Sequence, residues 1–157
     1  MDEKQIDELK GRELDAAIEI ELGARWLENP ERKTYTLYEA DMLARYPGLQ
    51  KRRSTKWAEP NQRMPSWDIS LPHYSTDIAA AWELDGEGWE WETYEDRFGL
   101  VIRVQHYNYA MYQDFFQRQS AFVKWSDFPT KSAAYAIARC RAWLKARAAL
   151  VSETQGE

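Results

Sequence analysis

The stretch of sequence that decides the fold is WEWETYEDRFGLVIRVQ, residues 89–105. Its first half alternates Trp and Thr with other, mostly acidic side chains, and its second half places apolar side chains such as Leu100 and Ile102 at every other position. A period of two is typical of a β-strand with one buried face. Asp96 and Arg97 form a short connection between the two runs. We therefore predict an antiparallel hairpin.

A third strand is expected at about residues 120–126, where apolar and polar side chains alternate again. In such a sheet the acidic side chains of Glu90 and Glu92 would lie across from Arg103 and Lys124 on a solvated face. Cross-strand pairs of opposite charge contribute about 0.2–1 kcal/mol each. We interpret these charges as a solvated sheet face rather than as a catalytic site.

A helix is predicted over residues 12–22, because apolar side chains recur there at three- and four-residue spacing. Gly23 provides a residue that tolerates the left-handed conformation in which helices commonly end. Gly11 separates this helix from residues 1–10, which we expect to be a frayed lead-in.

Two shorter helices are predicted from their capping residues. Thr36 and Glu39 match a capping box, which would begin a helix over about residues 37–46. Ser75 is a candidate N-cap for a helix over residues 75–84, because its hydroxyl can accept an unpaired amide of the first turn.

The last helix is predicted to start after Pro129 and to run to about Val151. Its alanine-rich apolar stripe indicates a close approach to the element on which it packs. Four basic residues fall outside that stripe, and we expect them at more exposed positions: Arg139, Arg141, Lys145 and Arg147. Residues 152–157 are expected to be frayed.

These elements predict an α+β fold in which a small, largely antiparallel sheet of three to four strands is packed with helices, in an alpha-beta-alpha sandwich-like arrangement. The length of 157 residues favours a single domain over residues 1–157. The core is expected to contain Leu14, Ile18, Ile78, Trp82, Ile102, Val104, Ile137 and Leu144.

Three segments, Gly11–Ala16, Tyr74–Trp82 and Ala136–Ala142, resemble the phage ABA sandwich domain family of small phage and prophage proteins. Of these, Tyr74–Trp82 is the most specific. The resemblance implies a helix–sheet–helix sandwich encoded by a phage or prophage, and it implies no activity and no catalytic residues. The chain departs from the family pattern in a long path over residues 27–67 and in a lengthened connection over residues 107–118. Segments added to a common scaffold are where function is expected.

Composition limits the classes of function. The net charge of −5 argues against a dedicated nucleic-acid binder, whose footprint is usually basic. The single cysteine, Cys140, excludes an internal disulfide and fits a reducing compartment. The sequence begins with polar and acidic residues rather than a signal peptide, and no apolar run approaches the roughly 20 residues that span a bilayer. We therefore expect a cytoplasmic location in a bacterial host.

Residues for metal binding or catalysis are scarce in this sequence. His73 and His106 are the only histidines, and no ligand spacing connects them to Cys140. Cys140 falls on the apolar stripe of the last helix, whereas a reactive thiol needs a partly exposed, electropositive setting. No glycine-rich phosphate loop is present. We therefore predict a protein that is not an enzyme and has no metal or cofactor.

The first candidate binding segment is the long basic loop over residues 47–67. Basic groups bind phosphate or carboxylate, and aromatic faces stack on bases or cations. An alternative is that this loop lies against the acidic residues 83–96 of the same chain. The candidate residues for an anionic ligand are Arg52, Arg53, Lys56, Trp57, Arg63 and Trp67.

The second candidate is the aromatic-rich connection over residues 107–118. Tyrosine-rich, weakly charged segments with Met resemble the centres of protein interfaces. An alternative is that Phe115 and Phe116 close the sheet edge while the tyrosines are half-buried. The candidate interface residues are Tyr107, Tyr109, Tyr112, Phe115 and Phe116.

We therefore interpret the chain as a non-enzymatic phage or prophage accessory protein that binds a host macromolecule, with a host protein as the favoured partner. Inhibition of a host defence or housekeeping system is the expected outcome of that binding. The main alternative is a protein that sequesters a nucleotide-like ligand at the basic loop. A third is nucleic-acid contact through the same loop, which should weaken steeply with salt. The sequence leaves a homo-oligomer open.

Overall fold

The computed structural model describes residues 1–29, 34–46, 72–106 and 117–155. The chain divides into two compact units. We call residues 11–72 the hairpin unit and residues 1–10 with 73–157 the sheet unit, and each is described by itself. The single domain over residues 1–157 stays a prediction.

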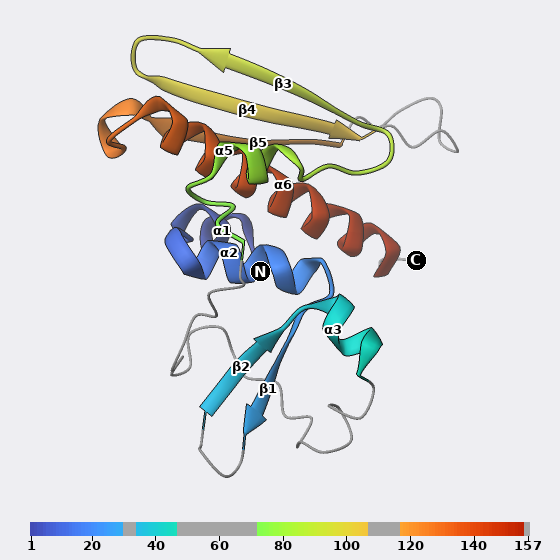
Figure 1. Ribbon diagram of the computed structural model, residues 1–157. Coiled ribbons are helices and arrows are strands. Elements are labelled where there is room, and N and C mark those ends of the chain that lie inside the picture. Colours follow the sequence, from blue (N-terminus) through green and yellow to red (C-terminus); the bar gives the residue numbers. More distant parts are fainter. Residues whose placement is uncertain (30–33, 47–71, 107–116, 156–157) are drawn as a thin grey trace. The chain divides into compact units, whose positions relative to one another are not determined.

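The hairpin unit begins with α2 (Gly11–Glu21), which confirms the predicted amphipathic helix. Gly23 has a φ of 105°, a left-handed conformation that favours glycine, and it ends the helix as expected. The strands β1 (Arg25–Asn29) and β2 (Thr34–Tyr38) then pair antiparallel, and α3 (Ala40–Arg45) follows (Figure 1). A small apolar cluster joins the helix to the hairpin; it contains Ala16, Ala24, Trp26 and Leu37, with Ile20 packed against it.

The predicted capping box at Thr36 and Glu39 is wrong. Thr36 lies in β2, where it pairs with Leu27 of β1, and Glu39 precedes α3 without a side-chain cap. The four-residue capping pattern is a local signal, and here the strand pairing overrides it. The strand β1 was not predicted at all.

The sheet unit contains the three predicted strands in the order β3-β4-β5. β3 (Trp89–Glu95) and β4 (Gly99–His106) form the predicted antiparallel hairpin, and β5 (Gln117–Lys124) pairs antiparallel with β4. Buried side chains of β4 and β5 alternate along one face, which confirms Ile102 and Val104 as core residues. The 3-10 turn η2 (Trp125–Asp127) follows β5. The α+β fold class is confirmed.

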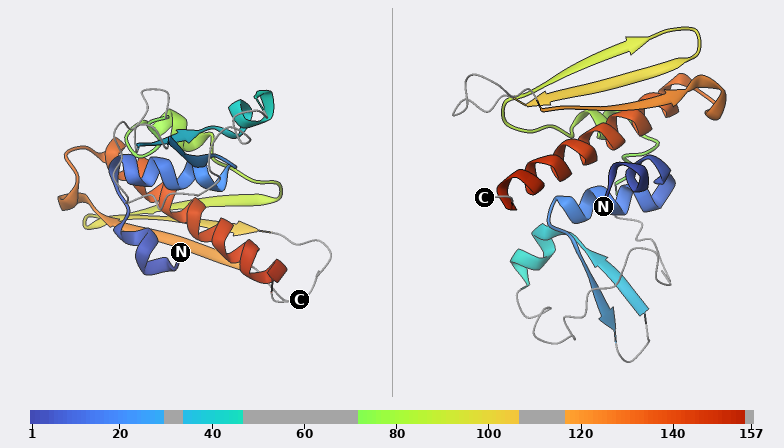
Figure 2. Two further views of the ribbon diagram at one scale, coloured as in Figure 1. Left: turned by 90° about the horizontal axis from the view of Figure 1, so that it is seen from below. Right: turned by 180° about the vertical axis from the view of Figure 1, so that it is seen from behind.

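The long helix α6 (Lys131–Gln155) packs on β4 and β5, along one face of the sheet (Figures 1 and 2). α1 (Glu3–Glu8) and α5 (Ile78–Trp82) pack against α6. Because it has neighbours on several sides, α6 is buried around most of its circumference. The core positions Ile137 and Leu144 are confirmed, but Arg139 and Lys145 are buried too, at 4% and 7% exposed. Their predicted exposure is wrong.

Residues 1–10 are not a frayed lead-in. Asp2 and Gln5 form a capping box at the start of α1, and Ile6 is only 1% exposed. The helix is held by this buried side chain and by polar contacts described below. At the other terminus α6 reaches Gln155, beyond the predicted end at Val151.

The cap of α5 also differs from the prediction. The carboxylate of Asp77, not the hydroxyl of Ser75, accepts the amides of Ala79 and Ala80. The helix therefore begins later than predicted.

The predicted apolar face of α5 is not buried in the core. Ile78 is 37% exposed and Trp82 is 44% exposed, while Ala81 is fully buried. The small alanine makes the close contact that the two large side chains were expected to make. The remaining expected core residues, Leu14 and Ile18, are buried.

Within the part of the chain that the structure describes, no helix combines the length and apolar character needed to cross a membrane.

Candidate functional site

Both binding segments predicted from sequence lie outside the described residues. The basic loop over residues 47–67 includes the candidates Arg52, Arg53, Lys56, Trp57, Arg63 and Trp67, and none of them is described. The same holds for Tyr107, Tyr109, Tyr112, Phe115 and Phe116 in the aromatic-rich connection. The candidate sites below are therefore built from other residues of the sheet unit.

The first candidate is the face of the sheet opposite α6, which we call the sheet surface. Alternation along the strands places Glu92 and Tyr94 of β3, Arg103 of β4 and Phe122 of β5 on this face. Tyr94 is 51% exposed and Phe122 is 53% exposed. Large aromatic side chains left in solvent on a paired sheet are available for contact with another molecule.

The polar groups of the sheet surface are organised around Tyr94. Its hydroxyl donates a hydrogen bond to Glu92 Oε2 at 2.8 Å, and the guanidinium of Arg103 lies 5.3 Å from the ring centroid. Arg103 is also 3.7 Å from Glu92 across the strand pair, which confirms the predicted Glu92–Arg103 contact. Lys124 instead lies opposite Gly99. The hydrogen bond to Glu92 raises the pKa of Tyr94, because it favours the protonated phenol.

The position of Phe122 depends on a glycine in the neighbouring strand. A Cβ atom at Gly99 would lie 2.9 Å from the ring of Phe122 and would overlap the main chain of β5. The absence of a side chain at Gly99 therefore lets the ring lie close over β4. This packing fixes the direction of an otherwise exposed aromatic side chain.

The second candidate is a hollow of about 530 Å³ beside β5. Val123 of β5 and Ile137 of α6 give it a buried apolar lining, and Phe122 and Phe128 add aromatic surface. This volume falls in the range of ligand pockets, about 300–1,000 Å³.

The charged side chains that line the hollow are mostly basic. Lys10, Lys124 and Arg141 contribute three cations, and Asp7 and Asp127 contribute two carboxylates. Asp7 is already bonded to Lys145, and Arg141 is bonded to the carbonyl of Leu9. Two lysines, Lys10 and Lys124, then remain against one carboxylate, Asp127, so the lining favours an anionic group over a cationic one.

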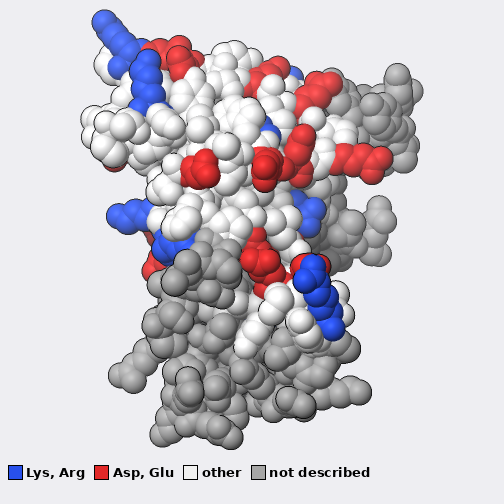
Figure 3. All heavy atoms as spheres, viewed as in Figure 1, with Lys and Arg blue, Asp and Glu red and all other residues white. Residues whose placement is uncertain are grey.

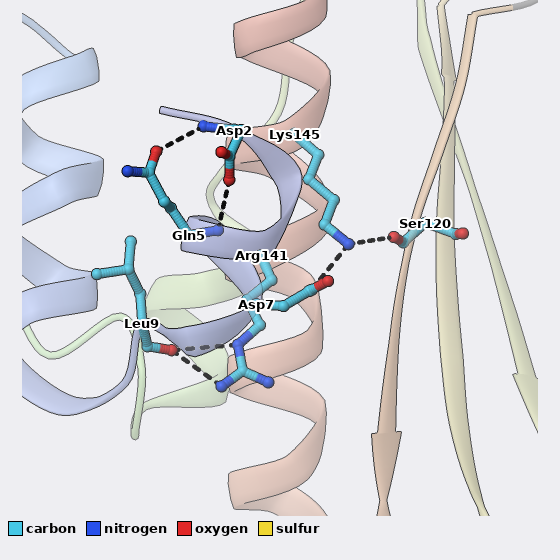
Figure 4. A network of polar contacts seen from close by, with 7 residues as sticks. All are labelled: Asp2, Gln5, Asp7, Leu9, Ser120, Arg141 and Lys145. Atoms are coloured by element: carbon cyan, nitrogen blue, oxygen red, sulfur yellow. Dashed lines mark hydrogen bonds and ion pairs between the residues drawn. The ribbon is translucent and has the colours of Figure 1, made fainter.

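A network of polar contacts holds the elements around this hollow together (Figure 4). The ammonium group of Lys145 on α6 lies 2.8 Å from the carboxylate of Asp7 on α1 and donates to the carbonyl of Ser120 on β5 at 3.0 Å. Arg141 donates through Nε and Nη2 to the carbonyl of Leu9, at 3.1 and 2.9 Å. One turn of α6 thus ties α1 to the edge of the sheet. Burial lowers the pKa of Arg141, and the nearby Asp7 carboxylate opposes that effect.

A third cluster surrounds the buried Arg139. Its guanidinium lies 3.3 Å from the ring centroid of Trp91 and 4.9 Å from that of Trp82, and it donates to the carbonyl of Leu84 at 2.7 Å. Burial lowers the pKa of Arg139 to about 10, and the Asp85 carboxylate partly offsets this. Because the cation is enclosed by its own chain, we interpret this cluster as structural.

The residues considered for metal binding or nucleophilic chemistry are not brought together. Cys140 is buried in α6, and its thiol donates to the carbonyl of Tyr74 at 3.3 Å. His73 is exposed, and the side chain of His106 is not among those described. Among the described residues, no group of three or more His, Cys, Asp or Glu side chains is arranged to hold a metal ion.

Comparison with known proteins does not identify a relative: no family model, no curated protein and no solved structure matches the chain.

Sequence reasoning missed the hollow and its network. Lys145 and Arg141 were assigned to an exposed helix face, and Asp7 to a frayed terminus. The one available signal was that this alanine-rich helix carries several basic residues but few acidic residues with which they could pair. The basic residues are Arg139, Arg141, Lys145 and Arg147.

Proposed function

We propose that this protein is a non-enzymatic phage or prophage accessory protein that acts by binding a protein of its bacterial host. The single observation that supports protein binding is the sheet surface, where Tyr94 and Phe122 stand in solvent beside Arg103. Aromatic residues and arginine are the side chains that contribute most energy in protein interfaces. Inhibition of a host defence or housekeeping system is the proposed consequence of that contact.

The chemistry of the sheet surface fits a protein partner better than a nucleic acid. Its charged side chains are of both signs, because Glu92 pairs with Arg103. Among the described residues on the face drawn in Figure 3, acidic and basic side chains are both scattered among uncharged ones, and they form no broad basic surface. A nucleic-acid footprint would need a concentration of basic groups.

The rigid placement of these side chains supports the same proposal. The phenol of Tyr94 is held by Glu92, and the ring of Phe122 is held against Gly99. Side chains already fixed in one position lose less conformational freedom when a partner binds. The sheet surface is therefore prepared for contact before the partner arrives.

The test is affinity capture from a bacterial lysate with the full chain as bait. Three baits are compared: the unsubstituted protein, Tyr94→Ala combined with Arg103→Ala, and Ile78→Ala. Ile78 is the matched control, because it is an exposed apolar residue on α5 and lies away from the sheet surface. We expect one host protein to be retained by the first and third baits and reduced at least about 10-fold on the second, which corresponds to about 1.4 kcal/mol. Equal retention by all three baits would show that the sheet surface is not the contact. Far-ultraviolet circular dichroism confirms that each bait is folded.

A further inference from the structure

We propose that the outer edge of β5, where it borders the hollow, binds an extended acidic peptide segment of a partner protein as a fourth strand of the sheet. This inference rests on the proposed function, because it assumes a protein partner, and it adds the conformation and chemistry of the segment that is bound. Strand addition of this kind combines main-chain hydrogen bonds with a pocket for alternate side chains.

The hydrogen-bonding pattern shows which residues of β5 face outward. The amide of Trp125 donates to the carbonyl of Phe98, which makes this pair a hydrogen-bonded one in the β4–β5 ladder. In an antiparallel pair such positions alternate, so Val123 also bonds to β4. The main-chain groups of Phe122 and Lys124 therefore point away from the sheet. Both residues are exposed. The carbonyl of Lys124 begins η2 and is used by that 3-10 turn, whereas the two amides and the carbonyl of Phe122 have no hydrogen-bond partner among the described residues.

The edge is closed just beyond these two residues. Ser120 is the next outward-facing position, and its carbonyl already accepts a hydrogen bond from the ammonium group of Lys145. Asp7 pairs with the same ammonium group and holds it in place (Figure 4). Native proteins commonly protect a sheet edge with a charged side chain. Here the protection stops before Phe122, so two amide donors, about 6.8 Å apart, and the carbonyl of Phe122 are left open. That length matches a segment of three or four residues.

The hollow supplies a position for one side chain of the added strand. Side chains alternate between the two faces of a strand, so every second residue of the segment would point toward α6 and enter the hollow. There it would meet Val123 and Ile137, which are 3% and 8% exposed. The apolar lining favours an apolar residue at this position.

Charge complementarity selects the neighbouring residues of the segment. The ammonium groups of Lys10 and Lys124 form no ion pair within the described part of the chain. The side chains of Lys124 and Val123 lie on opposite faces of β5. Lys124 therefore lies beside the peptide residues on either side of the apolar residue that enters the hollow. An acidic residue on either side of an apolar residue is therefore the expected pattern.

The occupant is a separate protein segment rather than a second copy of this chain. The other edge strand of the sheet, β3, is acidic, but it is already part of a folded three-stranded sheet. An extended segment can approach the short open length between Ser120 and Trp125 without bringing a second folded unit against α1. The test below includes assembly of copies as a contrary outcome.

The experiment begins by selecting ligands from a display library of random octapeptides on the immobilised full chain. An enriched peptide is then labelled with fluorescein, and its affinity is measured by fluorescence anisotropy. We expect enriched peptides to carry an apolar residue with Asp or Glu next to it. Methylation of the peptide's amide nitrogens, one at a time, then tests the strand geometry. Methylation at one alternate set of positions should weaken binding at least about 10-fold, and methylation at the other set less than about 2-fold, because only alternate amides face β5.

Substitutions in the protein locate the contact. Lys124→Glu should weaken the peptide at least about 10-fold. Arg118→Glu is the matched control, because it makes the same charge change in the same strand on the far side of Ser120, and it should change affinity less than about 2-fold. Circular dichroism and unfolding midpoints confirm that both variants fold.

Four results would overturn strand addition: no enrichment over an unrelated immobilised protein, no alternation in the methylation series, equal effects of the two substitutions, or binding that accompanies dimerisation in size-exclusion chromatography. The peptide should bind Tyr94→Ala normally, because Tyr94 is two strands away from the β5 edge. If the peptide test fails while lysate capture still depends on Tyr94 and Arg103, the edge proposal falls and the proposed function stands. If both tests fail, both proposals fall.

Discussion

The buried Arg139 makes an unusual prediction about two substitutions at one position. We expect Arg139→Lys, which keeps the positive charge, to destabilise the protein more than Arg139→Met, which removes it. The reason is that the planar guanidinium stacks on Trp91 and reaches the Leu84 carbonyl, whereas an ammonium group at the same place remains a buried charge without that stacking.

The magnitudes follow from these contacts. The hydrogen bond from a charged donor to Leu84, together with the carbonyl left without it, amounts to about 2–3 kcal/mol. The stacking at 3.3 Å on Trp91 adds about 2 kcal/mol in a desolvated site. In the opposite direction, burial lowers the pKa of Arg139 to about 10, which corresponds to an unfavourable term of about 3 kcal/mol for the charged form.

Arg139→Met loses the favourable contacts and also the unfavourable burial of charge, so we expect a net loss of about 1–2 kcal/mol. Arg139→Lys loses the stacking, retains the burial term and carries a more strongly hydrated cation, so we expect a loss of about 3–4 kcal/mol.

The assay is urea unfolding followed by circular dichroism at 222 nm, which avoids the tryptophan signals near the substituted position. With a slope of about 2 kcal/mol per molar, the midpoint should fall by about 0.5–1 M for Arg139→Met and by about 1.5–2 M for Arg139→Lys. Arg97→Lys is the control, because Arg97 lies over Phe98 at an exposed position and should change stability by less than about 0.5 kcal/mol. If Arg139→Lys is as stable as the unsubstituted protein, or more stable than Arg139→Met, the reasoning from planar stacking is refuted.

Three further predictions address the sheet surface and the caps. Replacing Glu92 with Gln should lower the pKa of Tyr94 toward its ordinary value, because the negative charge is removed and a neutral amide oxygen is a weaker acceptor for the phenol than a carboxylate. Nuclear magnetic resonance of tyrosine labelled at Cζ measures this, and an unchanged titration would contradict it. Since the pKa is raised in the folded state, this tyrosine stabilises the fold below pH 10, and that contribution is lost as the pH rises through the folded pKa. Gly99→Ala should lower the free energy of unfolding in urea by about 1–3 kcal/mol, because the added methyl group would displace Phe122 and the main chain of β5. An unchanged free energy of unfolding would mean that β4 and β5 can move apart at this position without cost. Asp77→Ala should cost about 1 kcal/mol through loss of the α5 cap, and a midpoint equal to that of the unsubstituted protein would remove the cap assignment.

The hairpin of β3 and β4 could be predicted because its signal lies in the chain itself. Alternation along residues 89–105 specifies which side chains share a face, and the short connection between the two runs indicates that they pair antiparallel. The exact register was not predicted. A two-residue connection at Asp96 and Arg97 would place Glu90 opposite Arg103, whereas the amide of Asp96 donates to the carbonyl of Gly99, the chain turns at Arg97 and Phe98, and Glu92 lies opposite Arg103. Fold class follows in turn, because an antiparallel sheet and helices of this length leave few other arrangements.

Helix caps were less predictable, because a capping pattern competes with other uses of the same residues. Thr36 belongs to a strand pair, and Asp77 outcompetes Ser75 as the cap of α5. Several residues of these types stand close together in the sequence, and the cap falls on whichever backbone conformation the surrounding packing selects.

The sequence by itself therefore determined the strongest local periodicities: those of the β3–β4 hairpin, α2 and α6, and which side chains share a face within the hairpin. Only the tertiary structure decided which of those faces is buried. α6 shows the difference, because its sequence has one apolar stripe, but the sheet, α1 and α5 all pack on it and enclose Arg139 and Lys145 as well. The physical reason is that periodicity is a property of one segment, whereas burial depends on how many other segments surround it, and the carbonyls and aromatic rings that those segments bring are what make a buried cation tolerable.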